Sequence, residues 1–248
     1  MIIYKRVLGF FISIILTLLL LLTCYFPNKI FIFIFISVFF CLFYFWTIKN
    51  RFIPYSLLFK YLLIILFFLS SFWLFFIVVD VLLLKYLLLL FILIYLIIFF
   101  NSVFKKIYLN KDIDHPLLIY IDLFCFWFIS YFLLYAIIIF RVGYWWTSLG
   151  LLASIVFSIL IRFYWQQINF KKNFLYLLGS LIILEQVFII GSFLALNLYS
   201  LTFILWIWYY LLTDFFVDKI KEEFIWHKKK KLIFFVLALF IFYLISVR

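Results

Sequence analysis

Four ionisable side chains lie inside long apolar runs in the second half of the chain. They are Asp122, Arg162, Glu185 and Asp214, and each belongs to a different run. A charged group surrounded by hydrocarbon is costly, so such residues usually face the interior of a helix bundle, where they pair with one another or meet water. The pattern therefore predicts a polar site between helices that can exchange a proton or bind a substrate.

Three of these residues share a similar depth. Counted from the same boundary of their runs, Asp122 is about six residues deep and Arg162 and Asp214 about four, which corresponds to roughly 6–9 Å at 1.5 Å per residue. One interpretation is solvation, in which Arg162 extends its side chain to water and Asp214 lies near the headgroups. The other is a cluster in which Arg162 neutralises Asp122 or Asp214, since the runs of Asp122 and Arg162 are neighbours in a hairpin.

Glu185 lies near mid-depth. It is the twelfth residue of a twenty-residue apolar run (174–193), so its side chain cannot extend to either surface. It must be protonated, paired with a cation such as Arg162, or in contact with a wet cavity. Gln186 adds a second polar group beside it. A protonated Glu185 that holds helices together by hydrogen bonding and a proton or substrate site are both open interpretations.

The elements that must position these residues are nine apolar runs. They cover residues 7–26, 30–48, 61–79, 86–104, 117–140, 143–165, 174–193, 201–217 and 232–247. Most are close to the roughly 20 residues that cross a bilayer as a helix, and a helix satisfies its own backbone hydrogen bonds in lipid. With 72% hydrophobic and 12% charged residues, the chain is predicted to be all-α, a polytopic transmembrane helix bundle of about nine spans (eight to nine).

We expect residues 1–248 to form a single integral membrane domain with two unlike parts. Residues 1–104 read as a featureless apolar scaffold, with Ser, Thr and Cys as the polar content of their spans. Residues 105–248 carry the intramembrane ionisable groups. The short outer connections, such as Arg141-Val142, force consecutive helices into antiparallel hairpins.

Basic residues alternate between the gaps that separate the runs. The odd-numbered gaps hold 17 of the 21 lysines and arginines when Arg162, at the edge of one of them, is included. Cationic loops resist translocation and stay in the cytoplasm, so we expect a cytoplasmic N-terminus and an outer C-terminus. The net charge of +12 then points to anionic lipid headgroups on the cytoplasmic side rather than to nucleic acid. The expected headgroup contacts are Lys228, Lys229, Lys230 and Lys231.

Small residues recur every four positions in the run 143–165. Gly150, Ser154 and Ser158 precede Arg162 at this spacing. Such a stripe lets two helices approach closely, so this face is expected to pack inside the bundle and to place Arg162 there.

Aromatic residues form two groups in the second half. Tyr144, Trp145 and Trp146 open a run at the outer surface and are expected to anchor it at the interface. The second group lies deeper in a run, where packing and stacking on a ligand are both open. Its members are Trp206, Trp208, Tyr209 and Tyr210.

Metal and redox chemistry find little support in the residue pattern. Asp112-Ile113-Asp114-His115 can be drawn as a site for a divalent metal, but Asp114 already fits a helix cap ahead of Pro116. The three cysteines lie in separate apolar runs, and none is near a histidine. We therefore predict no metal site and no cofactor.

A looser pattern begins at Glu185. Glu185-Gln186, then Leu194-Ala195-Leu196-Asn197, then Tyr209-Tyr210 precede a charged loop and a short final run. This arrangement, in the C-terminal third, resembles an uncharacterised multi-pass membrane protein family of candidate-phyla (Patescibacteria) bacteria. The resemblance implies a bacterial cytoplasmic (inner) membrane and implies no particular chemistry.

Three classes of function stay open, and the pattern favours the first. A transporter-like or solute-handling bundle would use the four intramembrane ionisable residues as a polar path. A structural or assembly subunit would need only packing, with the lysine-rich segment 218–231 available to dock a membrane-protein partner. A membrane-embedded enzyme acting on a lipid-linked substrate comes third, because both histidines lie in loops and no nucleophile–base pair is evident. Its inner-side candidates are Asp112, Asp114, His115, Asp122 and Asp214.

Overall fold

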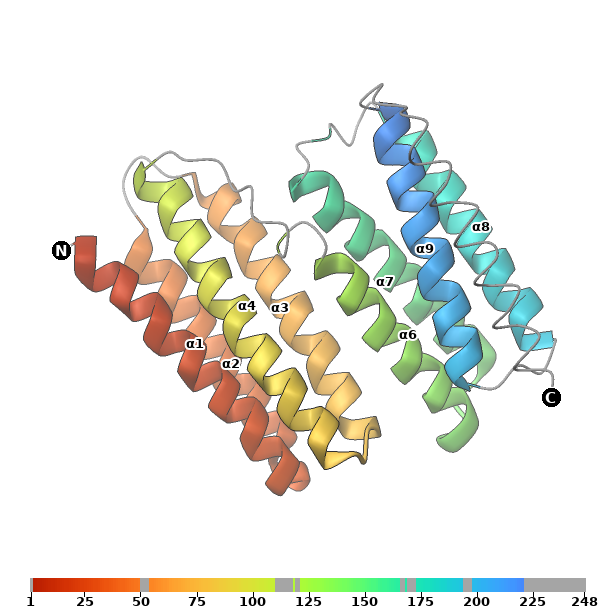
Figure 1. The fold of residues 1–248 in the computed structure, drawn as a ribbon, viewed down its shortest axis with the longest axis horizontal. Helices are drawn as coiled ribbons and strands as arrows, with labels where there is room; N and C mark the ends of the chain where they lie inside the picture. The colour runs from red at the N-terminus through yellow and green to blue at the C-terminus, as the bar shows by residue number, and fades with distance from the viewer. Residues whose placement is uncertain are drawn as a thin grey trace. The chain divides into compact units, whose positions relative to one another are not determined.

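The computed structural model describes residues 2–49, 54–109, 118, 121–165, 168, 173–193 and 198–220. Every regular element in these residues is helical, so the all-α prediction is confirmed for this part of the chain. Figure 1 shows the α-helices and the short 3-10 turn η1 (Pro27–Lys29). The α-helices are α1 (Ile2–Tyr25), α2 (Ile30–Ile48), α3 (Tyr55–Val78), α4 (Leu82–Leu109), α6 (Ile121–Ile139), α7 (Tyr144–Trp165), α8 (Phe174–Phe193) and α9 (Leu198–Ile220).

Five of these helices, α1 to α4 and α7, are long and apolar enough to cross a membrane, and the chain is a membrane protein on this ground. The apolar stretches of α6, α8 and α9 are shorter. These are the helices that carry Asp122, Glu185 and Asp214. The predicted ninth span (232–247) lies outside the described residues, as do Asp112, Asp114, His115, Lys228, Lys229, Lys230 and Lys231.

Three helices of the first half extend beyond the predicted apolar runs. α1 begins at Ile2 rather than at residue 7, α3 begins at Tyr55 rather than at residue 61, and α4 continues to Leu109 rather than ending at 104. These extensions contain basic residues, among them Lys5, Lys60, Lys105 and Lys106. Lysine lowers hydropathy but is a good helix former, so it limits the apolar run without ending the helix.

The helices form two compact units, and each is described by itself. Unit 1 (Met1–Ile121) contains α1 to α4, with α3 and α4 joined by a ladder of aromatic pairs. These pairs are Tyr61–Phe99, Phe68–Tyr95 and Phe72–Phe91. Residue numbers rise along α3 as they fall along α4, so the two helices run antiparallel.

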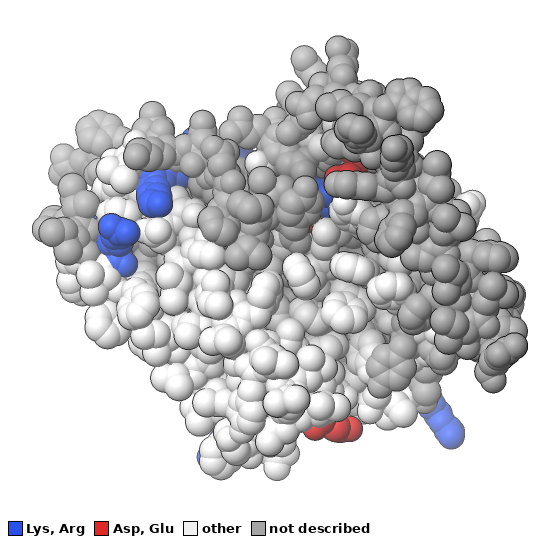
Figure 2. Space-filling view, in the orientation of Figure 1, with Lys and Arg blue, Asp and Glu red and all other residues white. Residues whose placement is uncertain are grey.

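One end of unit 1 gathers most of its described basic residues. Lys5 donates from Nζ to the Tyr108 hydroxyl at 2.8 Å, and Tyr108 donates to the carbonyl oxygen of Ile48 at 2.7 Å. Arg6 donates from Nε to Asn101 Oδ1 at 3.2 Å. The start of α1 and the ends of α2 and α4 therefore meet here. Figure 2 shows basic side chains at this end, next to a wide surface without charge.

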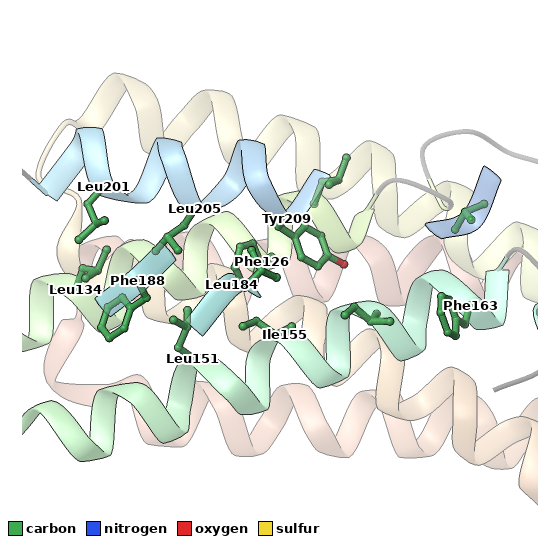
Figure 3. Packing of buried hydrophobic residues seen from close by; sticks show 13 residues of the cluster. Phe126, Leu134, Leu151, Ile155, Phe163, Leu184, Phe188, Leu201, Leu205 and Tyr209 are labelled. Atoms are coloured by element: carbon green, nitrogen blue, oxygen red, sulfur yellow. The ribbon is translucent and has the colours of Figure 1, made fainter. Parts of the chain in front are cut away.

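Unit 2 (Asp122–Arg248) contains α6, α7, α8 and α9. Buried apolar residues from all four helices form its core, and Figure 3 shows this packing from close by. Leu133 of α6 packs directly over Gly150 of α7, where an added Cβ would lie 2.9 Å from Leu133 Cδ2. Ser154 and Ser158 are buried on the same helix, so the small-residue stripe faces inward.

Candidate functional site

Arg162 is buried near the C-terminal end of α7 and lies between two carboxylates. Its guanidinium and the side chain of Asp122 are both fully buried. Nη1 is 3.5 Å from Asp122 Oδ2 on α6, and Nη2 is 3.3 Å from Asp214 Oδ1 on α9. The side chain of Asp214 keeps 26% of its surface exposed. The sequence offered Asp122 or Asp214 as the partner of Arg162. In the structure Arg162 pairs with both, and its side chain does not extend to water.

The meeting of these residues follows from helix direction. Asp122 is in the first turn of α6, and Arg162 is in the last turn of α7. α9 runs back toward the same end and carries Asp214 close to its own C-terminus. Because a guanidinium presents its donors as a rigid planar fork, it can bond two carboxylates on different helices.

Tyr209 completes the cluster. It is fully buried, and its hydroxyl donates to Asp122 Oδ2 at 2.5 Å. Its ring stacks on Phe126, with centroids 4.4 Å apart. Tyr210, one position on, places its ring 6.0 Å from the Arg162 Cζ. The sequence had grouped Tyr209 only with deep aromatic residues, and nothing in its spacing pointed to Asp122 on another helix.

The remaining deep aromatic residues are used for packing. Trp206 donates from Nε1 to the carbonyl oxygen of Leu123 at 3.0 Å and packs against Trp127. This bond joins α9 to α6 one helical turn from the site. Trp145 and Trp146, by contrast, are 80% and 72% exposed, as expected for residues that anchor a helix at an interface.

Glu185 forms a separate polar pair. Its Oε1 accepts a hydrogen bond from the hydroxyl of Ser148, in the first half of α7. Ser148 and Arg162 are fourteen residues apart on α7, which is about 21 Å of helix. Glu185 therefore meets α7 near the end opposite to Arg162. The alternative that paired Glu185 with Arg162 was therefore wrong.

Gln186 does not join either group. It is exposed, whereas Glu185 is partly buried. Successive helical residues are about 100° apart around the axis at 3.6 residues per turn, so Gln186 turns away from α7. Its inclusion in the predicted site was wrong for this reason.

An apolar layer lies between the two polar groups. Leu151 and Ile155 of α7 pack there with Leu184 of α8 and Leu205 of α9, as Figure 3 shows. All four side chains are buried. The described part of unit 2 thus has two polar stations at different positions along its helices, the cluster around Arg162 and the Ser148–Glu185 pair. Buried apolar side chains lie between them.

Two carboxylate oxygens are available for further interactions. Asp122 Oδ1 and Glu185 Oε2 are buried and take no hydrogen bond from the described residues. In the described ranges, no group of three or more His, Cys, Asp or Glu side chains is placed to hold a metal ion. Carboxylates beside a fixed cation, as at Arg162, can exchange protons and form ion pairs.

Comparisons of the chain with family models, with curated proteins and with solved structures find no match.

Proposed function

We propose that this protein is a transporter-like, solute-handling bundle in which the cluster of Asp122, Arg162, Asp214 and Tyr209 binds a proton or a polar solute. The observation that carries the proposal is the fully buried Arg162 with a carboxylate partner on each of two other helices. Ionisable groups inside a membrane are functional candidates by default because each costs free energy to bury.

Stability alone is a poor reason to keep such a cluster. Buried ion pairs can often be replaced by apolar residues of similar volume without loss of stability. With both carboxylates ionised, the cluster holds one negative charge in excess, which a proton or a cationic group can neutralise. Asp214 is partly exposed and supplies contact with the outside of the unit.

The second station suits a transport path that is closed in this state. Glu185 has one bonded and one unbonded oxygen, and the apolar layer of Leu151, Ile155, Leu184 and Leu205 stands between it and Arg162. A solute or proton would pass between the stations only after a movement of α7 relative to α8 and α9. This arrangement supports alternating access to two sites.

The proposed setting is a bacterial inner membrane with the N-terminus inside, nine spans and the C-terminus outside. The alternation of basic gaps supports it. Anionic lipid headgroups would then meet the basic gaps, including Lys228, Lys229, Lys230 and Lys231.

Topology can be tested with reporter fusions. A fluorescent protein fused after Lys106 or after Lys221 is expected to fluoresce, and alkaline phosphatase at the same points is expected to stay inactive, because both gaps should be cytoplasmic. Fusions after Arg141 should give the reverse pattern. Opposite signals from the Lys106 and Lys221 fusions would contradict the nine-span arrangement.

Transport can be tested with Glu185→Gln. We expect the purified wild-type protein in liposomes to give currents on addition of one or more pools of amino acids, sugars, nucleosides or carboxylates. Glu185→Gln keeps the shape and the Ser148 hydrogen bond but cannot release a proton. We therefore expect the current of Glu185→Gln to be at least about tenfold lower than that of the wild type, with unchanged yield and melting temperature.

The matched control is Gln186→Leu, one residue along on the exposed face, which should keep wild-type currents. A Glu185→Gln protein that aggregates would instead favour a role for Glu185 in holding α7 to α8. Wild-type liposomes that respond to no pool would contradict the transport proposal.

A structural or assembly subunit is the second candidate. The observation that favours it is that the buried polar contacts of the two stations each join two helices, as expected of contacts that only hold a bundle together. These contacts are Ser148–Glu185, Arg162–Asp122, Arg162–Asp214 and Tyr209–Asp122. It predicts a stable protein without solute-dependent current, so the same measurement separates the two roles. Of the candidates for the enzyme alternative, Asp112, Asp114 and His115 lie outside the described residues, whereas Asp122 and Asp214 belong to the cluster around Arg162.

A further inference from the structure

We propose that a groove between α2 and α3 in unit 1 binds one acyl chain of an anionic glycerophospholipid, with the phosphate held by Lys49. The groove has a volume of about 450 Å³, within the usual range for small-molecule sites. It is lined by Leu42, Phe45, Trp46, Lys49, Tyr55, Ser56, Leu58, Phe59 and Leu62.

The groove has an apolar floor and apolar walls. Phe45 and Leu58 are almost fully buried and form the floor. Trp46 is 74% exposed and Phe59 58% exposed, so they project as walls on α2 and α3. A methylene chain laid between them would contact hydrocarbon on three sides, which an acyl chain in the surrounding bilayer also prefers.

Lys49 lies where a headgroup would be. It follows the last residue of α2, while Trp46, Phe45 and Leu42 lie progressively farther from it along the same helix. Lys49 Nζ is 3.5 Å from the centroid of the Tyr55 ring, and this cation–π contact holds the ammonium at the mouth of the groove. Ser56, also at the mouth, adds a hydroxyl donor for a phosphate oxygen.

Charge selects an anionic lipid over a neutral one. The described cations at this end of unit 1 are Lys5, Arg6, Lys49, Lys60, Lys105 and Lys106. Asp80, between α3 and α4 at the opposite end, is the single acidic residue among the described residues of unit 1. A juxtamembrane cluster of this kind attracts anionic headgroups.

Size favours a lipid over a partner helix. From Leu42 to Lys49 the groove follows about 10 Å of α2 at 1.5 Å per residue. A helix that crosses the bilayer needs contact along about 30 Å and is itself about 10 Å wide. The length of the groove therefore fits part of one acyl chain better than it fits a membrane-spanning helix.

The test is photolabelling of the full-length protein in phosphatidylcholine liposomes. Phosphatidylglycerol with a diazirine on its acyl chain is the probe, and diazirine-bearing phosphatidylcholine is the headgroup control. We expect adducts from phosphatidylglycerol to concentrate in the peptides that contain residues 42–49 and 55–62. Lys49→Gln should lower this labelling about fivefold, the effect of one lysine near a charged membrane surface.

Two pairs of variants separate the groove from general attraction. Leu42→Trp fills the groove and should remove the labelling, whereas Phe35→Trp, on the exposed face of the same helix and outside the groove, should not. Lys60→Gln removes an equal charge at the same end without touching the lining and should change labelling much less than Lys49→Gln. Melting temperature and elution volume check that each variant is folded.

Four results would overturn the proposal. One is equal labelling of the groove peptides by both lipids, and another is labelling spread evenly over exposed α2 and α3 residues. The third is an effect of Lys60→Gln as large as that of Lys49→Gln. If irradiation instead joins the protein to a second polypeptide through a photoreactive residue placed at position 42, a protein partner occupies the groove and the lipid assignment is wrong.

Discussion

Arg162→Met is expected to destabilise the protein by about 3–5 kcal/mol, the usual cost of leaving a buried charge without its partner. The substitution removes the cation between Asp122 and Asp214 and leaves two carboxylates facing each other inside unit 2. One of them is fully buried and cannot gain water. The measurement is the free energy of unfolding in mixed micelles, followed by tryptophan fluorescence as denaturant is added.

The matched control is Arg141→Met, at an exposed arginine between α6 and α7. It removes the same charge and should change the free energy of unfolding by less than about 0.5 kcal/mol. Arg162→Lys should fall between the two, because an ammonium keeps the charge but lacks the planar fork. If Arg162→Met changes the free energy of unfolding as little as Arg141→Met does, the ion pairs of Arg162 contribute nothing to stability.

A triple variant separates stability from function. Arg162→Met combined with Asp122→Asn and Asp214→Asn leaves no buried charge, so much of the lost stability should return. If the cluster handles a proton or a solute, the refolded triple variant should still give no solute-dependent current. Recovery of both stability and current would contradict the proposed role of the cluster.

Asp122→Asn is expected to destabilise the protein by about 2 kcal/mol, because it replaces the charged acceptor of two buried hydrogen bonds with a neutral one. Asp122 is fully buried and accepts from both Tyr209 and Arg162. Asparagine fits the same space and can still accept these bonds, but it no longer attracts the arginine. The measurement is the same unfolding experiment.

Asp214→Asn is the comparison, because it removes the other carboxylate of the same arginine. The side chain of Asp214 is 26% exposed, and solvent screens its ion pair, so the loss should stay below about 1 kcal/mol. Both variants should lower solute-dependent current if each carboxylate takes part. A cost for Asp214→Asn that equals or exceeds that of Asp122→Asn would mean that burial does not set the strength of these pairs.

Much of the fold follows from composition and spacing. Runs of apolar residues near bilayer length can only be helices in lipid, and short connections such as Arg141-Val142 impose antiparallel neighbours. This directionality also places Asp122, Arg162 and Asp214 at the same end of unit 2. The stripe of Ser154 and Ser158 predicted correctly which side of α7 packs inward.

The errors in the site concern positions around the helix axis. Hydropathy records depth along a helix but leaves its rotation and its lateral partners open. The partner of Glu185, Ser148, was therefore not predicted, and Gln186 was assigned to the site although it turns outward. Tyr209 could be seen as a deep aromatic residue, yet nothing in its spacing specified a bond to Asp122.

By itself, the sequence determined an all-helical membrane protein in which the acidic and basic residues inside the apolar runs are confined to the second half. The tertiary structure decided which of them meet: one guanidinium takes two carboxylates and a tyrosine joins them, while Glu185 remains apart across an apolar layer. The physical reason is that depth depends on the summed transfer free energy of each segment, a local quantity. Pairing depends on helix rotation and side-chain packing, which arise only when four helices are assembled.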